Sequence, residues 1–129
     1  MDTDSLIRRI IALPRQFKEA GNKSIVALLK ESGYFEYFDN VNENNIAIIL
    51  GESPEMIDDW LIWSADKRVS SGWYILEKKE NQYIVGYWPK NKFEELHFSD
   101  KRLACASFIK REIEGIRDRH QEARDLLEK

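Results

Sequence analysis

Apolar residues recur at helical spacing through the first half of the chain and predict four helices. In chain order, the apolar positions of these helices are Leu6–Leu13, Ile25–Leu29, Ile46–Leu50 and Met56–Leu61. Pro14 is expected to end or kink the first helix, because proline lacks an N–H and clashes with the preceding turn. Gly33 fits the left-handed position that closes the second helix, and Gly51 is expected to stop the third. The run Ser53–Glu55 is typical of a helix start, with a capping serine, a proline in the first turn and an acid at the positive dipole end.

The period of the pattern changes from helical spacing to two after residue 68. Three aromatic and β-branched runs then predict the strands Trp73–Leu76, Tyr83–Trp88 and Phe93–Phe98. Glu80 and Asn81 favour a turn between the first two strands. The three runs together predict an antiparallel meander.

The last part of the chain predicts one long helix that begins at a cap on Ser99 or Asp100. Its apolar stripe consists of Cys105, Phe108, Ile109, Ile113 and Ile116. Residues beyond Ile116 are mostly charged, so we expect that end to project from the body. Helices, then a meander, then a helix indicate an α+β fold in a single two-layer domain. Its helical part spans about residues 1–68, its sheet about 72–98 and its C-terminal helix about 100–128.

Charge is distributed unevenly along the 129 residues, although the net charge is only −3. No Lys or Arg occurs between Glu31 and Asp66, whereas nine acids do: Glu31, Glu36, Asp39, Glu43, Glu52, Glu55, Asp58, Asp59 and Asp66. This acidic segment is either a solvated face or an electrostatic docking surface for a basic partner. The negative net charge argues against direct binding of nucleic acid.

Location is indicated by what the sequence lacks. No apolar run approaches the roughly 20 residues that span a bilayer, and the first residues are acidic where a secretory signal would be basic. Cys105 is the only cysteine, and a lone thiol fits a reducing compartment. We therefore expect a cytoplasmic protein without a membrane partner.

Catalytic and metal-binding patterns are missing as well. The six glycines are scattered and form no phosphate loop. Cys105, His97 and His120 are too few and too separated to predict a metal site. We expect no cofactor and no enzymatic activity. A small enzyme that pairs Asp66 or Glu95 with His97 stays as an alternative.

The acidic segment supplies the predicted contact residues for a protein partner. Asp58 and Asp59 are adjacent on a helix and diverge by about 100°, whereas Glu55 and Asp59 share a face and repel each other unless a cation compensates. An exposed Trp63 beside acids suits an interface anchor. The predicted contacts are Glu36, Asp39, Glu43, Glu55, Asp58, Asp59, Trp63 and Asp66. The interleaved aromatics that would add apolar anchoring are Tyr34, Phe35, Tyr37 and Phe38.

The run from Ile57 to Tyr74 resembles bacterial immunity proteins of polymorphic toxins, of the contact-dependent growth-inhibition kind. The similarity extends through Tyr83–Tyr87, Phe98–Asp100 and Ala104–Cys105, over roughly residues 40–115. It implies a cytoplasmic protein that binds the toxic C-terminal domain of a cognate effector, often a nuclease, and blocks its active site. These proteins share no universal motif, so no binding residue is transferred. An adaptor domain for another basic protein is the alternative.

Overall fold

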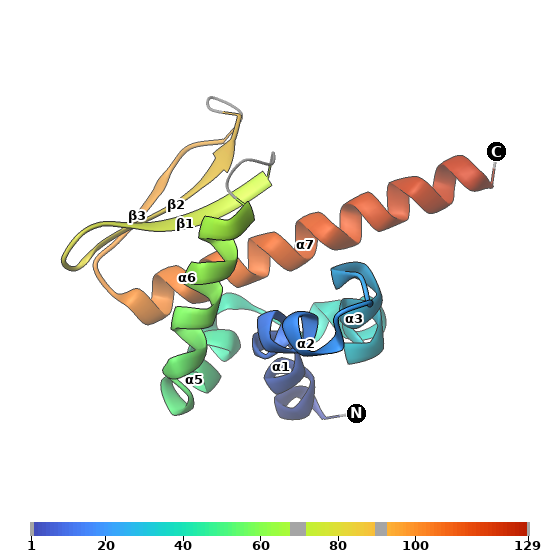
Figure 1. Ribbon diagram of the computed structural model, residues 1–129, viewed down its shortest axis with the longest axis horizontal. Coiled ribbons are helices and arrows are strands. Elements are labelled where there is room, and N and C mark those ends of the chain that lie inside the picture. Colours follow the sequence, from blue (N-terminus) through green and yellow to red (C-terminus); the bar gives the residue numbers. More distant parts are fainter. Residues whose placement is uncertain (1, 68–71, 90–92, 129) are drawn as a thin grey trace.

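The computed structural model describes residues 2–67, 72–89 and 93–128 and confirms the predicted α+β fold (Figure 1). Its N-terminal part is helical and contains α1 (Thr3–Ile11), α2 (Leu13–Ala20), α3 (Ile25–Ser32), α4 (Tyr34–Tyr37), the 3-10 turn η1 (Phe38–Asn40), α5 (Glu43–Glu52) and α6 (Glu55–Lys67). The rest consists of β1 (Gly72–Lys79), β2 (Gln82–Trp88), β3 (Leu96–Phe98) and α7 (Lys101–Leu127). Of the run that carries the family resemblance, residues 68–71 lie outside the described residues.

Most predicted breaks in the helical part are confirmed. The first pattern divides into α1 and α2, with Pro14 in the first turn of α2, where its missing N–H leaves no bond unmade. Gly33 closes α3 in the left-handed conformation, at a φ of 96°. Gly51 does not stop α5, which continues to Glu52 and has its C-cap at Ser53, because the residue before a proline disfavours helical backbone and Pro54 follows. The aromatic run that begins at Tyr34, to which the sequence assigned no element, forms α4.

The sheet is the predicted antiparallel meander, in the order β1-β2-β3. Asn81 takes a positive φ of 60° in the turn between β1 and β2, as hairpin turns require. Ile75 lies opposite Val85, and Val85 lies opposite Leu96. Figure 1 shows α6 and α7 on the same side of this sheet.

The third strand is shorter than predicted. It begins at Leu96, and Phe93 lies outside it. The ring of Phe93 stacks on Trp73 at 5.1 Å between centroids and meets Tyr87 edge-on at 5.1 Å. Aromatic packing, not strand pairing, therefore explains why an apolar residue stands at this position.

Helix α7 runs between the sheet and the N-terminal helices and contacts α3, α5, α6, β1 and β2. The side chain of Asp100, the residue before α7, accepts hydrogen bonds from the backbone N–H groups of Arg102 and Leu103. Asp100 is therefore the N-cap of this helix, one of the two caps that the sequence predicted. Cys105 is fully buried, as expected for a small core residue. Beyond Ile116 the helix extends past the body (Figure 1), and Leu126 and Leu127 are 71% and 87% exposed.

A buried serine joins α6 to the sheet. Ser64 Oγ accepts a hydrogen bond from the N–H of Ile75 at 2.9 Å and donates one to the carbonyl of Ile75 at 2.9 Å. Among the described strands β1 stands at the edge of the sheet, so Ile75 has no strand neighbour on that side. The Ser64 hydroxyl thus bonds both the N–H and the carbonyl of buried Ile75. Buried backbone groups at a sheet edge destabilise a fold when they lack a hydrogen-bond partner.

Removing this hydroxyl should destabilise the fold. We expect Ser64→Ala to lower the free energy of unfolding by about 1–3 kcal/mol, because it leaves a buried N–H and a buried carbonyl without a partner. Urea denaturation followed by circular dichroism measures the change. The matched control is Ser107→Ala, since Ser107 is also buried but its hydroxyl accepts from the Arg111 side chain and, within the described residues, bonds no backbone group. Equal losses in both variants would contradict this account.

Candidate functional site

A groove of about 620 Å³ lies between α2 and α6, and we call it the α2–α6 groove. Its lining residues are Pro14, Arg15, Phe17, Lys18, Asp59, Ile62, Trp63 and Asp66. The four from α6 are spaced i, i+3, i+4 and i+7, so they form one face of that helix. The volume lies within the range of known ligand pockets. Three predicted contact residues, Asp59, Trp63 and Asp66, therefore meet at one concave site.

Trp63 is held in a fixed orientation at this site. Its Nε1–H donates to the carboxylate of buried Glu112 on α7 at 3.0 Å. Its ring meets Phe17 edge-on at 5.3 Å and Trp60 edge-on at 6.3 Å. Because the only donor of the indole is used inside the protein, Trp63 offers the groove only carbon surface. Ile62 and Phe17, at 60% and 41% exposed, extend this apolar floor.

The charged residues of the groove are divided between its two walls. Arg15 Nε donates to Asp59 Oδ2 at 2.5 Å and so links α2 to α6. This cation compensates the repulsion between Asp59 and Glu55 that the sequence predicts. Lys18 on α2 and Asp66 on α6 form no ion pair with any described residue. One wall of the groove is thus basic and the other acidic.

Other acids of the segment also pair with cations from elsewhere in the chain. Asp58 accepts from Lys101 at 2.9 Å, so the two adjacent aspartates bind cations on different helices. Two further pairs are Glu52 with Arg8 and Glu31 with Lys23. Acids without an ion pair to any residue in the described ranges are Glu36, Asp39, Glu43, Glu55 and Asp66.

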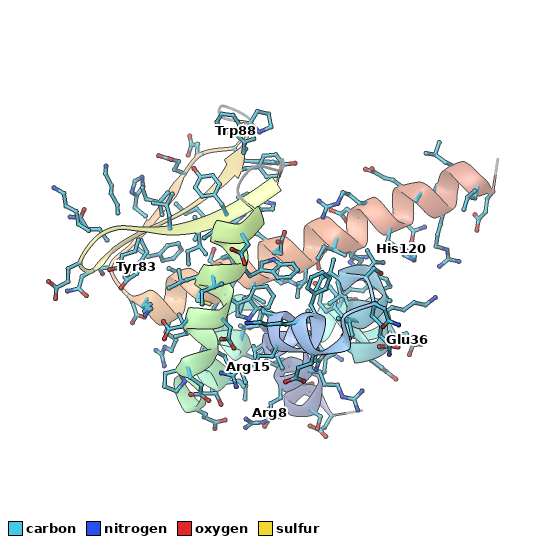
Figure 2. The ribbon with its side chains drawn as sticks, in the orientation of Figure 1. Arg8, Arg15, Glu36, Tyr83, Trp88 and His120 are labelled. Carbon is cyan, nitrogen blue, oxygen red and sulfur yellow. The ribbon has the colours of Figure 1, made fainter. Side chains whose placement is uncertain are left out.

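The predicted contact residues do not form one continuous patch. Figure 2 places Glu36 near His120 and the distal half of α7, away from Arg15. Asp39 lies in η1 next to α4, and Glu43 lies in the first turn of α5. Of the predicted contacts, Asp59, Trp63 and Asp66 on α6 line the groove.

Side chains of the aromatic run of α4 and η1 contact α7. The hydroxyl of buried Tyr34 donates to Glu114 and accepts from Lys110 Nζ at 2.8 Å. Burial and the bond to Glu114 raise the pKa of this hydroxyl. The guanidinium of Arg117 lies over the Phe38 ring at 3.8 Å. Tyr34 is buried, so it is not an exposed anchor, whereas Phe38 is partly buried.

The two other members of the run differ in exposure. Phe35 is partly buried and stacks on His120 at 4.9 Å. Tyr37 is exposed. Of the four aromatics, Tyr37 is the one that presents a large part of its ring to solvent.

Of the residues considered for catalysis, Glu95 and His97 lie close together, whereas Asp66 lies on another element. Leu96 and Phe98 pack toward the core, so His97 between them points to the opposite face of the sheet. Its Nε2 lies 3.9 Å from the carboxylate of Glu95, and both side chains are exposed. Asp66 lies in the α2–α6 groove instead. Burial raises the pKa of the Cys105 thiol, which keeps it protonated.

Within the described residues, no group of three or more His, Cys, Asp or Glu could hold a metal ion. None of the helices they form is long and apolar enough to cross a membrane.

The α2 wall of the groove was missed by reasoning from the sequence. Arg15, Phe17 and Lys18 come from the basic N-terminal part, outside the acidic segment. The local signal for Phe17 is an apolar position after Pro14. Nothing in the pattern shows that it meets Trp63, because a contact across 46 positions has no local signature.

Comparisons with known proteins add no relative. The chain matches no protein-family model, and neither characterised proteins nor solved structures gave a significant match.

The cluster that joins α4 to α7 should make stability depend on pH. Burial by itself would raise the pKa of Glu114, but hydrogen bonds from Tyr34, Lys110 and Arg117 outweigh it and hold the pKa below the ordinary value of 4.5. A carboxylate with a lowered pKa in the folded state stabilises the fold above the unfolded pKa. That stabilisation is lost as the pH falls through the folded pKa.

We expect Glu114→Gln to lower the free energy of unfolding by about 1.5–3 kcal/mol at neutral pH, the usual worth of hydrogen bonds to a charged group. The deficit relative to the unmodified protein should shrink as the pH falls from about 4.5 through the lowered folded pKa, below which both proteins carry a neutral group at this position. Urea titrations at several pH values measure it. Glu122→Gln, an exposed site on the same helix, is the control. A deficit that stays constant down to about pH 3 would contradict the explanation.

Proposed function

We propose that this protein is an immunity protein that binds and neutralises the toxic C-terminal domain of a bacterial effector, most simply a nuclease, in the cytoplasm. The observation that carries the proposal is the surface of α6. There an apolar floor at Ile62 and Trp63 adjoins Asp66, an acid that pairs with no cation of the described residues. The resemblance of Ile57–Tyr74 to immunity proteins covers the same helix.

The chemistry of this surface suits a basic protein partner. A nuclease must present Lys and Arg to bind phosphate, and Glu55 and Asp66 offer carboxylates to such groups. Exposed ion pairs contribute only about 0–1 kcal/mol each, so charge alone gives little affinity. Apolar side chains that anchor in pockets supply most of the binding energy of interfaces. The α2–α6 groove provides such a pocket beside the acids.

In this proposal the protein acts by occupancy and not by catalysis. It needs no metal and no cofactor, and it binds no nucleic acid itself. It covers the basic surface with which the toxin domain holds its substrate. Inhibition is then stoichiometric, with one immunity protein consumed for each toxin domain.

Co-expression tests the proposal directly. We expect the protein to protect bacterial cells from the toxic C-terminal domain of the effector encoded next to it, and to co-elute with that domain in size-exclusion chromatography. The isolated complex should lack toxin activity. Separate elution at micromolar concentration, with the toxin domain still active, would refute the proposal for that pair.

Charge reversal on α6 gives the residue-level prediction. Asp58 and Asp59 are poor choices because each pairs with a cation of this chain. Reversing either charge would change the stability of the fold as well as the binding of the partner. Asp66→Lys combined with Glu55→Lys should slow association with the toxin domain about 10-fold or more at low salt, with little change in melting temperature. Stopped-flow or surface plasmon resonance measures the rate.

The matched control for this double variant changes the same charge elsewhere. Glu122→Lys combined with Glu128→Lys alters two exposed acids at the distal end of α7. It should leave the association rate within about twofold of the unmodified protein. Equal slowing in both double variants would mean that net charge, and not the α6 face, steers the partner.

A further inference from the structure

The charges that line the α2–α6 groove cancel. Arg15 and Lys18 stand on α2, and Asp59 and Asp66 stand on α6. The Arg15–Asp59 pair already neutralises itself across the groove. What remains for a ligand is one lysine on one wall, one aspartate on the other and an apolar floor between them. The groove is therefore amphipathic and not simply acidic. A negative electrostatic potential alone does not determine which ligand would fit it.

We propose that the α2–α6 groove receives a short amphipathic segment of the toxin domain. An apolar side chain of that segment packs on Phe17, Ile62 and Trp63. A neighbouring Lys or Arg pairs with Asp66, and an Asp or Glu pairs with Lys18. The inference rests on the proposed function for the identity of the partner, whereas the chemistry of the segment follows from the groove itself.

An apolar side chain fits the floor because the floor has no free donor. The indole N–H of Trp63 is bonded to Glu112, and Ile62 and Phe17 have no polar group. The contacts of Trp63 with Phe17, Trp60 and Glu112 hold its ring before any ligand arrives. Binding therefore avoids much of the entropy cost of ordering a side chain, and preorganised sites gain affinity in this way.

Lys18 and Asp66, which pair with no other described residue, determine the orientation of the segment. Lys18 and Asp66 stand on opposite helices, so a ligand that carries both signs can satisfy both only in one direction. Reversed placement puts like charges together and is disfavoured. A partner protein is favoured over a second copy of this chain as the occupant, because each copy carries a net charge of −3 and would repel the other.

A peptide library displayed on phage, with random dodecapeptides as the probe, tests the inference without the toxin. The full chain is immobilised, and enriched clones are then measured against two variants. Ile62→Asp changes the floor of the groove. Ile48→Asp is the matched control, since Ile48 on α5 is similarly exposed, at 55% against 60%.

We expect enriched peptides to carry an apolar residue flanked by a basic residue on one side and an acidic residue on the other. Their affinity should fall about 30-fold or more for Ile62→Asp, the effect of losing a central anchor, and should change less than threefold for Ile48→Asp. The exchange Lys18→Asp with Asp66→Lys should favour peptides with the reversed order of charges. Absence of enrichment, or equal binding to the two isoleucine variants, would overturn the inference.

Failure of this inference is distinguishable from failure of the proposed function. If Ile62→Asp still neutralises the toxin domain as well as the unmodified protein does, the function stands and the groove is not its site. If peptides bind in the groove but no toxin is neutralised, the peptide site stands and the toxin is not its partner. Concentration-dependent dimerisation in analytical ultracentrifugation that Ile62→Asp abolishes would identify a second copy as the occupant and overturn the assignment to a partner.

Discussion

Burial of one apolar stripe on α7 is the constraint on which the remaining structure depends. The stripe consists of Cys105, Phe108, Ile109, Ile113 and Ile116, all at most 3% exposed. Each large side chain of this kind contributes roughly 1.5–3 kcal/mol when it leaves water. Helices α3, α5 and α6 and strands β1 and β2 all contact α7. The helical half and the sheet are therefore joined through an element that comes last in the chain.

The rotation of α6 about its axis follows from this constraint, and the candidate site follows from that rotation. Trp60 is buried against Phe108, and its indole N–H donates to the carbonyl of Ile11 at 2.9 Å. With Trp60 inside, Asp58 faces the start of α7 and Asp59 faces α2. The adjacent carboxylates consequently bind different cations. The face shared by Asp59 and Trp63 becomes the acidic wall of the groove.

Local features of the fold were predictable from the sequence because interactions between residues close together in the chain determine them. The break at Pro14, the left-handed Gly33, the cap at Asp100 and the hairpin turn each depend on a few neighbouring residues. Phe93 was assigned to a strand because its position fits an alternating apolar pattern. Such a pattern indicates that a side chain is half-buried, but it does not show which residues cover that side chain. Pairings such as Arg15 with Asp59 were not predictable, since they join residues 44 positions apart.

The same limit applies to the acidic segment, whose formal charge of −9 is not the charge that a partner meets. Within the part of the chain that the structure describes, four of its nine acids pair with cations from outside the segment, so much of the asymmetry in the sequence is internal attraction in the fold. The unmatched acids are spread over α4, η1, α5 and α6, where they can steer a basic protein from a distance. Steering weakens as salt screens exposed charges, whereas contact with the apolar floor at Ile62 and Trp63 does not depend on salt in this way. In the proposed function, the two parts of recognition therefore act at different ranges: the scattered acids would raise the rate of encounter, and the groove between α2 and α6 would determine which partner remains bound.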